Sequence, residues 1–353
     1  MPSLRKILMA TASLAVSQVS SSPTSETNFT VAMVRAPPPN WPLPILSTNW
    51  TGITLNLSQA VDRGIELTAE SVQNNASLIS FPELWFPAYP SGSNKNNWYR
   101  DQLPSYVQNC LVVGSEDWSR LVTAAQDGGI YLAFGFCERT DHSIFMAQAL
   151  ISPSGDLLVH RHKLRPSGEE RFIFSDGSMD MSNVVTTPHG RIGLLECYEH
   201  FWPSMTIPMQ AQLENIHLFE FPYLVDDNVE GANWWEVTAV NQGAEAHYAV
   251  LSGAYVFHPG IGAVWVMNPN GTVAASVSSE VDFDEVPMLY HSIDTTSINS
   301  SKTYDVDGGV SWGVVEQIRN GFPSHIPRDP GTFVDHHEVS ISALTSGNFS
   351  GGE

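Results

Sequence analysis

"IGLLECYEHFW" (residues 192–202) is an apolar run that ends in a thiol and continues with acidic, imidazole and aromatic side chains. A short apolar run of this kind predicts a strand buried in the core of a layered fold. Cys197 closes the run, and a cysteine in such a position is more often an inert buried thiol than a reactive one. A chemical role for Cys197 therefore depends on what the rest of the chain brings beside it.

Similar runs recur on both sides of this stretch. Buried strands are predicted at "SLISF" (77–81), "IYLAFGF" (130–136), "IFMAQALI" (144–151) and "IHLFEF" (216–221). Between them, apolar residues at helical spacing predict a helix that begins near Ser58, and further helices are expected over 202–213 and 231–246. Because strands and helices alternate without a linker-like break, we expect one α/β domain of stacked sheets covered by helices.

The two ends of the chain differ from this pattern. Residues 1–28 combine Arg5 and Lys6 with a modest apolar run, small residues and no acid before Glu26, which predicts a leader. A secretory signal is favoured because charge precedes the apolar run, and an organellar transit peptide is the alternative. Residues 29–330 form the expected domain, and the Gly-, Ser- and acid-rich residues 331–353 are expected to be a flexible tail.

Composition limits the classes of partner. The 353 residues include 37 acidic and 16 basic ones, for a formal net charge of −21. This charge opposes binding to nucleic acid or to an anionic membrane surface. No stretch approaches the roughly 20 uninterrupted apolar residues of a spanning helix. We therefore expect a soluble protein that binds no nucleic acid and does not span a membrane.

Cysteines and sequons bear on the compartment. Three cysteines are few, and an odd number cannot all be paired, so they do not predict a disulfide framework. A single disulfide between Cys110 and Cys137 is left open. Seven asparagines begin N-x-S/T triplets, namely Asn28, Asn49, Asn56, Asn75, Asn270, Asn299 and Asn348. Leader and sequons slightly favour the secretory pathway and a glycoprotein, with a cytoplasmic or organellar location as the alternative.

Three apolar runs finish on residues that a core does not need. Glu83 follows "LISFP", Lys163 follows "LLVHRH" and Cys197 follows "IGLLE". Each residue alone is more often a solvated side chain or an inert thiol. Strand ends at one edge of an α/β sheet converge, however, on a common crevice. Covalent catalysis needs a nucleophile, a proton acceptor and a positive charge that stabilises the anion formed. A thiol, a carboxylate and an ammonium group provide these three functions.

The three blocks also resemble a known family. "FPELWFPAYP" (81–90), "HRHKLRPSGEERFIFSDGS" (160–178) and "GLLECYEHFWP" (193–203) are similar, in order and spacing, to the glutamate, lysine and cysteine blocks of the nitrilase, or carbon–nitrogen hydrolase, superfamily. The resemblance implies that Glu83 is the general base, Lys163 the stabilising lysine and Cys197 the nucleophile. It further implies that Glu170 positions substrate and lysine, whereas the neighbouring Glu169 is solvated.

The same resemblance carries expectations for fold, assembly and reaction. It implies an α-β-β-α sandwich that forms a homodimer or larger homo-oligomer and needs no cofactor or metal. Cys197-Tyr198-Glu199 has the acid that is typical of the nitrile-hydrolysing branch, C-W-E, whereas amidase-like branches commonly have C-Y-D or C-N-D. We therefore expect a nitrilase that releases carboxylic acid and ammonia through a thioimidate and a thioester. An amidase or carbamoylase, or a nitrile or cyanide hydratase, is the alternative, and a non-catalytic assembly protein is a weaker one.

Some residues near the blocks allow two interpretations. The flanking aromatics could line a pocket for a bulky apolar nitrile or serve packing and an oligomer surface: Trp85, Tyr89, Trp98, Tyr99 and Trp202. The longer first loop, 37–50, could shape the pocket or an interface. His160 and His162 would share one face of a strand and could hold a metal, as could the adjacent pair His336 and His337, but no carboxylate or cysteine completes a recognisable ligand spacing. The region 305–331 departs from the family pattern.

Overall fold

The structure is a computed structural model that describes residues 28–93, 95, 97–179, 183–298, 311–321, 336–347 and 349–351. The predicted leader lies outside the described residues except for Asn28, the first residue of β1. None of the helices in the described part of the chain has the length and apolar character that crossing a bilayer requires.

Two six-stranded sheets form the centre of the molecule. In spatial order the first contains β14 (Met288–Asp294), β1 (Asn28–Val34), β2 (Leu78–Ser80), β3 (Tyr131–Arg139), β4 (Ile144–Ile151) and β5 (Leu157–His162). The second contains β13 (Val273–Val277), β12 (Val264–Met267), β10 (Tyr255–His258), β8 (Ile216–Glu220), β7 (Gly190–Glu196) and β6 (Val184–Thr187). A short pair, β9 (Tyr223–Leu224) and β11 (Ile261–Gly262), lies apart from both sheets.

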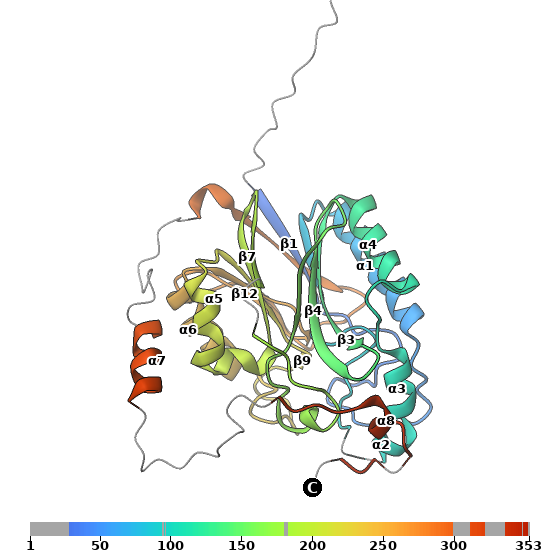
Figure 1. Cartoon of the computed structure of the whole chain (residues 1–353). Helices are drawn as coiled ribbons and strands as arrows, with labels where there is room; N and C mark the ends of the chain where they lie inside the picture. The colour runs from blue at the N-terminus through green and yellow to red at the C-terminus, as the bar shows by residue number, and fades with distance from the viewer. Residues whose placement is uncertain are drawn as a thin grey trace, which may run out of the picture.

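Helices cover the outer face of each sheet (Figure 1). The first sheet is covered by α1 (Leu57–Gln73) and α4 (Glu116–Gly128), with α2 (Trp98–Asp101) and α3 (Leu103–Asn109) below them, and the second by α5 (Pro203–Ala211) and α6 (Thr238–Ser252). The remaining helical segments are η1 (Gly168–Phe172), η3 (Cys197–Phe201), η4 (Thr295–Ser297), α7 (Ser311–Asn320) and α8 (Ile341–Leu344). The expected α-β-β-α sandwich is therefore confirmed.

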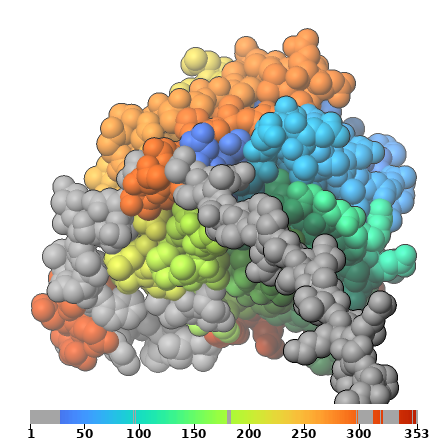
Figure 2. Space-filling view, turned by 90° about the horizontal axis from the view of Figure 1, so that it is seen from above, coloured from blue at the N-terminus to red at the C-terminus, as the bar shows by residue number. Residues whose placement is uncertain are grey.

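Apolar residues from both sheets form the inner core. Val31 of β1 and Leu150 of β4 lie in the same fully buried cluster as Leu194 of β7 and Leu218 of β8. Each strand presents these residues at every second position, as a strand with one face in a core requires. β14 returns antiparallel beside β1, with Asn28 opposite Asp294, and Figure 2 shows these chain segments side by side.

Two helix boundaries differ from the expectation. The first helix begins at Leu57, one residue before Ser58, because the side chain of Asn56, and not that of Ser58, accepts a hydrogen bond from the N–H of Gln59. The helix expected over 231–246 begins only at Thr238. Val237 before it is extended and bridges to Val225, so the preceding residues form turns.

The C-terminal segment is also more ordered than its composition indicates. In residues 336–347, Val339 and Leu344 are buried, and Ser340 forms a bridge with Ser143. The N–H of Val339 donates to Ser175 Oγ at 2.9 Å. Two apolar side chains and backbone pairing attach this part of the predicted tail to the domain.

Cys110 and Cys137 form a disulfide, which settles the pairing that the sequence left open. The bond joins the end of α3 to β3, 27 residues later in the chain. Cys197 is the free cysteine, and it is buried.

Candidate active site

Glu83, Lys163 and Cys197 come together at one edge of the sandwich. Glu83 follows β2, Lys163 directly follows β5 and Cys197 directly follows β7. β2 and β5 run in the same direction in the first sheet, with β3 and β4 between them, and β7 lies in the facing sheet. The three strands end at the same edge of the sandwich, which brings these side chains close. Gly135 of β3 allows the turn at Glu83 to approach, since a Cβ atom at Gly135 would lie 2.6 Å from the Glu83 Cα.

Two of the strand-end turns are strained. Cys197 has a φ of 41°, and Leu84, directly after Glu83, has a φ of 52°. A non-glycine residue in this left-handed region costs on the order of 1 kcal/mol, which the surrounding contacts must offset. After Cys197 the chain enters the tight turn η3, and the N–H of Glu196 donates to Glu199 Oε2 at 2.9 Å. A sharp turn after a strand is also how α/β hydrolases expose a nucleophile.

Lys163 is the centre of a buried ion-pair network. Its Nζ donates to Glu83 Oε2 at 3.1 Å and to Glu170 Oε2 at 2.9 Å, and the lysine and Glu83 are fully buried. Glu170 accepts further hydrogen bonds from the Tyr89 hydroxyl at 3.0 Å and from the Ser167 N–H at 2.6 Å. Breaking a buried pair leaves an uncompensated charge, so each member depends on the others.

The protonation of this network follows from burial and from the neighbouring charges. Burial raises the pKa of Glu83, while Lys163 opposes the shift. Burial by itself would lower the pKa of Lys163, but the carboxylates of Glu170 and Glu83 outweigh it and raise that pKa. Lys163 is therefore a cation over the whole physiological range. Glu83 Oε1 is buried and has no hydrogen-bond partner among the described residues, so this oxygen is available for proton transfer.

The Cys197 thiol is neutral at rest. Burial raises its pKa, Glu83 raises it further, and Lys163 and the N–H of Tyr198 oppose the shift. A neutral thiol needs a base before it can act as a nucleophile. Because burial also raises the pKa of Glu83, its carboxylate is a stronger proton acceptor than an exposed one.

A cavity of about 570 Å³ opens onto Cys197. Glu170 and the exposed Glu169 line it, as do Leu46 and Thr48 of the long first loop, whereas Lys163 and Glu83 lie behind the wall. Much of the remaining wall is aromatic, formed by Tyr89, Tyr198, Phe201, Phe221, Tyr223, Trp234 and Trp235. The wall also carries polar side chains, among them Lys95, Asn233 and Glu236, and a cavity that combines apolar and converging polar groups is typical of a small-molecule site.

The aromatic residues that flank the blocks divide between the two interpretations. Of the five, Tyr89 lines this cavity. Trp85 and Trp98 are buried in the hydrophobic core, and Tyr99 packs edge to face on Phe349 at 5.2 Å between ring centroids. Trp202 is 48% exposed. Three of these aromatic residues therefore pack against other side chains, one lies at the surface, and Tyr89 alone of the five lines this cavity.

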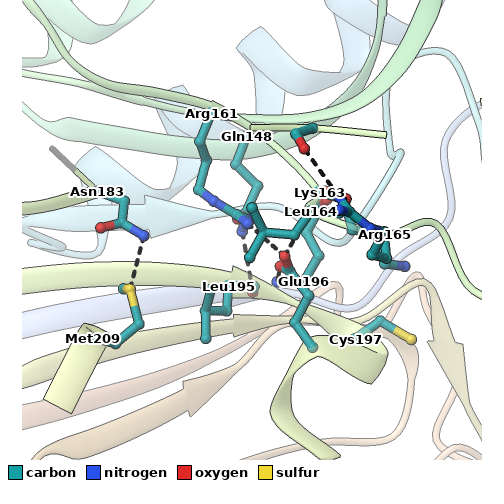
Figure 3. A network of polar contacts seen from close by, with 12 residues as sticks. Gln148, Arg161, Lys163, Leu164, Arg165, Asn183, Leu195, Glu196, Cys197 and Met209 are labelled. Carbon is teal, nitrogen blue, oxygen red and sulfur yellow. Dashed lines mark hydrogen bonds and ion pairs between the residues drawn. The ribbon is translucent and has the colours of Figure 1, made fainter. Parts of the chain in front are cut away.

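A buried polar layer lies behind the site, between the sheets. Figure 3 shows Gln148, Arg161 and Lys163 of the first sheet facing Leu195, Glu196 and Cys197 of the second. Arg161 donates to Gln148 Oε1 at 2.5 Å and to Glu199 Oε1 at 2.6 Å. Gln148 donates in turn to the carbonyl of Leu195 at 3.2 Å and to Glu220 Oε2 at 3.0 Å. These bonds tie β4 and β5 to the strand that carries Cys197.

On the other side of β8, a chain of histidines reaches the backbone of Cys197. His200 Nδ1 lies 2.9 Å from the Cys197 carbonyl, and His200 Nε2 lies 2.8 Å from His217 Nε2. Because a carbonyl only accepts, His200 donates through Nδ1 and accepts through Nε2, so His217 donates through Nε2. His217 Nδ1 lies 2.8 Å from Glu214 Oε2. This chain holds the strained turn at Cys197 in place.

Comparisons with known proteins identify the family of this chain. The model of the carbon-nitrogen hydrolase family matches residues 30–303. The chain belongs to the carbon–nitrogen hydrolase family. It is 35% identical to an arylacetonitrilase of Arthroderma benhamiae over 218 residues, which are 58% of this chain and 64% of that relative. It is 37% identical to a cyanide hydratase of Leptosphaeria maculans over 171 residues, or 47% of this chain and 48% of that one.

A solved structure supports the fold of this carbon–nitrogen hydrolase. A mutant amidase of Nesterenkonia sp. AN1 in complex with acrylamide superimposes with a TM-score of 0.56 and 17% identity, covering 85% of this chain and 98% of the amidase. The matched segment spans less than two thirds of the length of the Arthroderma relative.

The structure adds residues to the site of this carbon–nitrogen hydrolase that sequence reasoning missed. Gln148, Arg161 and Glu220 support the site from within strands, and His200 and His217 support it from behind. One signal was available in the sequence, since polar residues at inward positions of otherwise apolar strands are uncommon. Most of their contacts join segments that are distant in the sequence, such as Gln148 with Glu220 and His200 with His217, so the sequence alone could not pair them.

Proposed function

We propose that this chain is a nitrilase that hydrolyses the C≡N bond of an organic nitrile to a carboxylic acid and ammonia. The observation that carries the proposal is the placement of Cys197 and Glu170 in the cavity wall, with Lys163 and Glu83, which are ion-paired to each other, buried behind it. The relationship to an arylacetonitrilase and a cyanide hydratase gives additional support.

In the first half of the proposed reaction, Glu83 takes the Cys197 proton and the thiolate adds to the nitrile carbon. Protonation of nitrogen gives a thioimidate. A water molecule that Glu83 deprotonates then attacks the same carbon, and Lys163 stabilises the tetrahedral species. Proton transfer to the amine and cleavage of the C–N bond release ammonia and leave a thioester.

The second half of the reaction regenerates the thiol. A second water molecule, again activated by Glu83, attacks the thioester carbon, and the C–S bond breaks to release the acid. Glu170 holds Lys163 and Tyr89 in position throughout, through its contacts at 2.9 and 3.0 Å. The net reaction consumes one nitrile and two water molecules and releases one carboxylic acid and one ammonia.

We further propose an arylacetonitrile or a similarly bulky apolar nitrile as the substrate. The aromatic wall of the cavity, including Tyr198 and Trp235, fits a flat apolar group by stacking and burial. The Arthroderma relative is named for that substrate class.

A second candidate reaction shares the first steps. If the tetrahedral species expels the thiolate instead of ammonia, the product is an amide, as in a nitrile or cyanide hydratase. The similarity to a cyanide hydratase favours this alternative over an amidase.

The test is a panel of arylaliphatic, aromatic and aliphatic nitriles with cyanide and the matching amides. Acid, amide and ammonia are measured together for each compound. The proposal expects equal acid and ammonia from arylaliphatic nitriles. Amide without ammonia would support the hydratase, turnover of amides alone the amidase, and no turnover at all a non-catalytic protein.

The chain's processing and assembly are separate proposals. We propose a glycoprotein of the secretory pathway, supported by the disulfide and by five exposed sequon asparagines: Asn28, Asn49, Asn56, Asn75 and Asn270. The mass of the native protein before and after deglycosylation tests it. We also propose a homo-oligomer, supported by the exposed Val250 and Leu251 on α6, to be tested by light scattering.

A further inference from the structure

We propose that Glu138, His160 and His162 form a binding site for a divalent transition-metal ion, with Zn²⁺ as the ion that best matches the ligands. The three side chains lie on β3 and β5, on the helix-facing side of the first sheet. The site goes beyond the proposed hydrolysis and does not depend on it.

The donor atoms converge on one point. His160 Nε2 lies 2.6 Å and His162 Nε2 lies 2.9 Å from the same oxygen, Glu138 Oε2. One donor atom of each residue lies within 4.8 Å of the others. Two donors about 2.0 Å from a tetrahedral zinc ion are about 3.3 Å apart. Each distance from Glu138 Oε2 to a histidine nitrogen therefore needs to lengthen by less than about 1 Å to admit the ion.

The residue types match the chemistry of zinc. Two imidazoles and one carboxylate are the three protein ligands of several zinc sites, with water in the fourth position. The side chains of His160 and His162 are 32% and 25% exposed, whereas that of Glu138 is 8% exposed. An ion can therefore enter from solvent while the carboxylate stays anchored. The formal net charge of −21 also favours cations around the chain.

The surroundings restrict the rings to this arrangement. Phe145 of β4 stacks on His162, with ring centroids 4.1 Å apart and planes 7° apart. Phe136 of β3 lies nearly parallel to His160 at 6.4 Å. All these residues stand on three adjacent strands, and ligands on rigid strands hold a site more precisely than ligands on loops.

The position of the site separates it from catalysis. Arg161 and Lys163 alternate with the two histidines along β5 and its end, and they point to the opposite face, toward the polar layer. A bound ion would connect edge strand β5 to β3 across β4, directly beside Lys163. The site therefore serves to stabilise this end of the sheet. Zn²⁺ does not contact the reacting carbon.

The experiment uses the full chain with Cys197→Ala, so that the active-site thiol cannot bind the metal. After removal of metal by chelation and dialysis, Zn²⁺ alone is titrated against a chromophoric chelator. We compare this reference with the same chain carrying Glu138→Gln, which keeps the shape but weakens the ligand. His142→Gln, at an exposed histidine in the nearby turn, is the matched control.

We expect one Zn²⁺ per reference chain, unchanged binding in the His142→Gln chain and at least about 10-fold weaker binding in the Glu138→Gln chain. Zn²⁺ should also raise the melting temperature of the reference chain and leave that of the Glu138→Gln chain unchanged. Equal binding by all three chains would overturn the site.

A second measurement tests the site even if the Glu138→Gln chain does not fold, because it uses only the reference chain. Co²⁺ added to the reference chain should show the intense visible bands of a four- or five-coordinate ion. The weak spectrum of hydrated Co²⁺ would overturn the proposal. Neither measurement involves turnover, so failure here is independent of failure of the nitrilase proposal.

Discussion

Along β7 and β8, the side chains that face the other sheet change from apolar to acidic within three inward positions. Ile192 and Leu194 of β7 are followed by Glu196, and the same side of β8 carries Ile216, Leu218 and then Glu220. We call the cluster around Leu194 and Leu218 the apolar half of the inter-sheet layer. The polar half consists of Ser80, Gln148, Arg161, Glu196, Glu199 and Glu220.

The comparison shows that one strand pattern can serve two purposes. In both halves every second residue points inward, so the fold is built in the same way. In the apolar half the inward residues remove hydrocarbon from water, which contributes most of the folding free energy. In the polar half they provide a charged, dry environment at the strand ends, where Glu83, Lys163 and Cys197 lie.

The polar half and the site together hold more acid than base. Five buried carboxyl groups face two cations, Arg161 and Lys163: the acids are Glu83, Glu170, Glu196, Glu199 and Glu220. Burial raises the pKa of Glu83 and of Glu196, and it raises the pKa of Glu220 to about 8. Protonation of part of this set is how the layer avoids an excess of buried negative charge.

The largest expected effect concerns activity alone. Cys197→Ala removes the proposed nucleophile, so ammonia release from a nitrile should fall by at least about 10³-fold. The melting temperature should stay within a few degrees, because one small side chain at the cavity wall is changed. Turnover by the Cys197→Ala protein at the wild-type rate would exclude the proposed mechanism.

The next effect should concern stability alone. Leu218→Ala in the apolar half leaves a cavity between the sheets and should lower the free energy of unfolding by about 2–5 kcal/mol. Denaturant titration measures this loss. At temperatures where the variant is folded, its kcat should match the wild type, and a large loss of kcat without loss of stability would show that the two halves are not separate.

Another effect on stability should appear only as a dependence on pH. The folded pKa of Glu220, about 8, lies above its unfolded value near 4.5, so the folded state binds the extra proton between these values. The stability that this proton gives is complete below about pH 4.5 and decreases by up to about 1.4 kcal/mol per pH unit until about pH 8.

Glu220→Gln mimics the protonated form and should flatten this decrease. Denaturant titrations of both proteins at pH 5, 6.5 and 8 measure it. The Gln side chain can accept the bond from Gln148 and donate to Ser80, which now donates to Glu220 Oε1 at 3.2 Å. Parallel stability curves for the two proteins would contradict a raised pKa at Glu220.

The smallest effect on activity should come from Tyr89, which lines the cavity and also contacts the ion-pair network. Tyr89→Phe removes the hydroxyl that donates to Glu170 Oε1 at 3.0 Å and keeps the ring in the cavity wall. Loss of one hydrogen bond to a charged group should reduce kcat/KM by about 10-fold. If Tyr89 only binds substrate, KM would rise and kcat would stay unchanged.

The strands of both halves and the residues at their ends could be predicted from the sequence. The side-chain contacts between the strands could not. The apolar runs and their period predicted the strands, and three motifs predicted which strand-end residues gather. The partners of Arg161, and His200 beside His217, lie on other strands or helical segments, and sequence spacing carries no information about them. Glu138 is the clearest case, since the carboxylate beside His160 lies 22 residues earlier in the chain.

The disulfide between Cys110 and Cys137 leaves Cys197 as the sole free thiol of a chain with three cysteines. Counting thiols in the native, unreduced protein therefore counts intact sites, one equivalent per chain. Because Cys197 is only 6% exposed and reached through the cavity, a slim electrophile should label it faster than a bulky one. Labelling slowed by a bound nitrile or acid would then measure occupancy directly, without following the reaction.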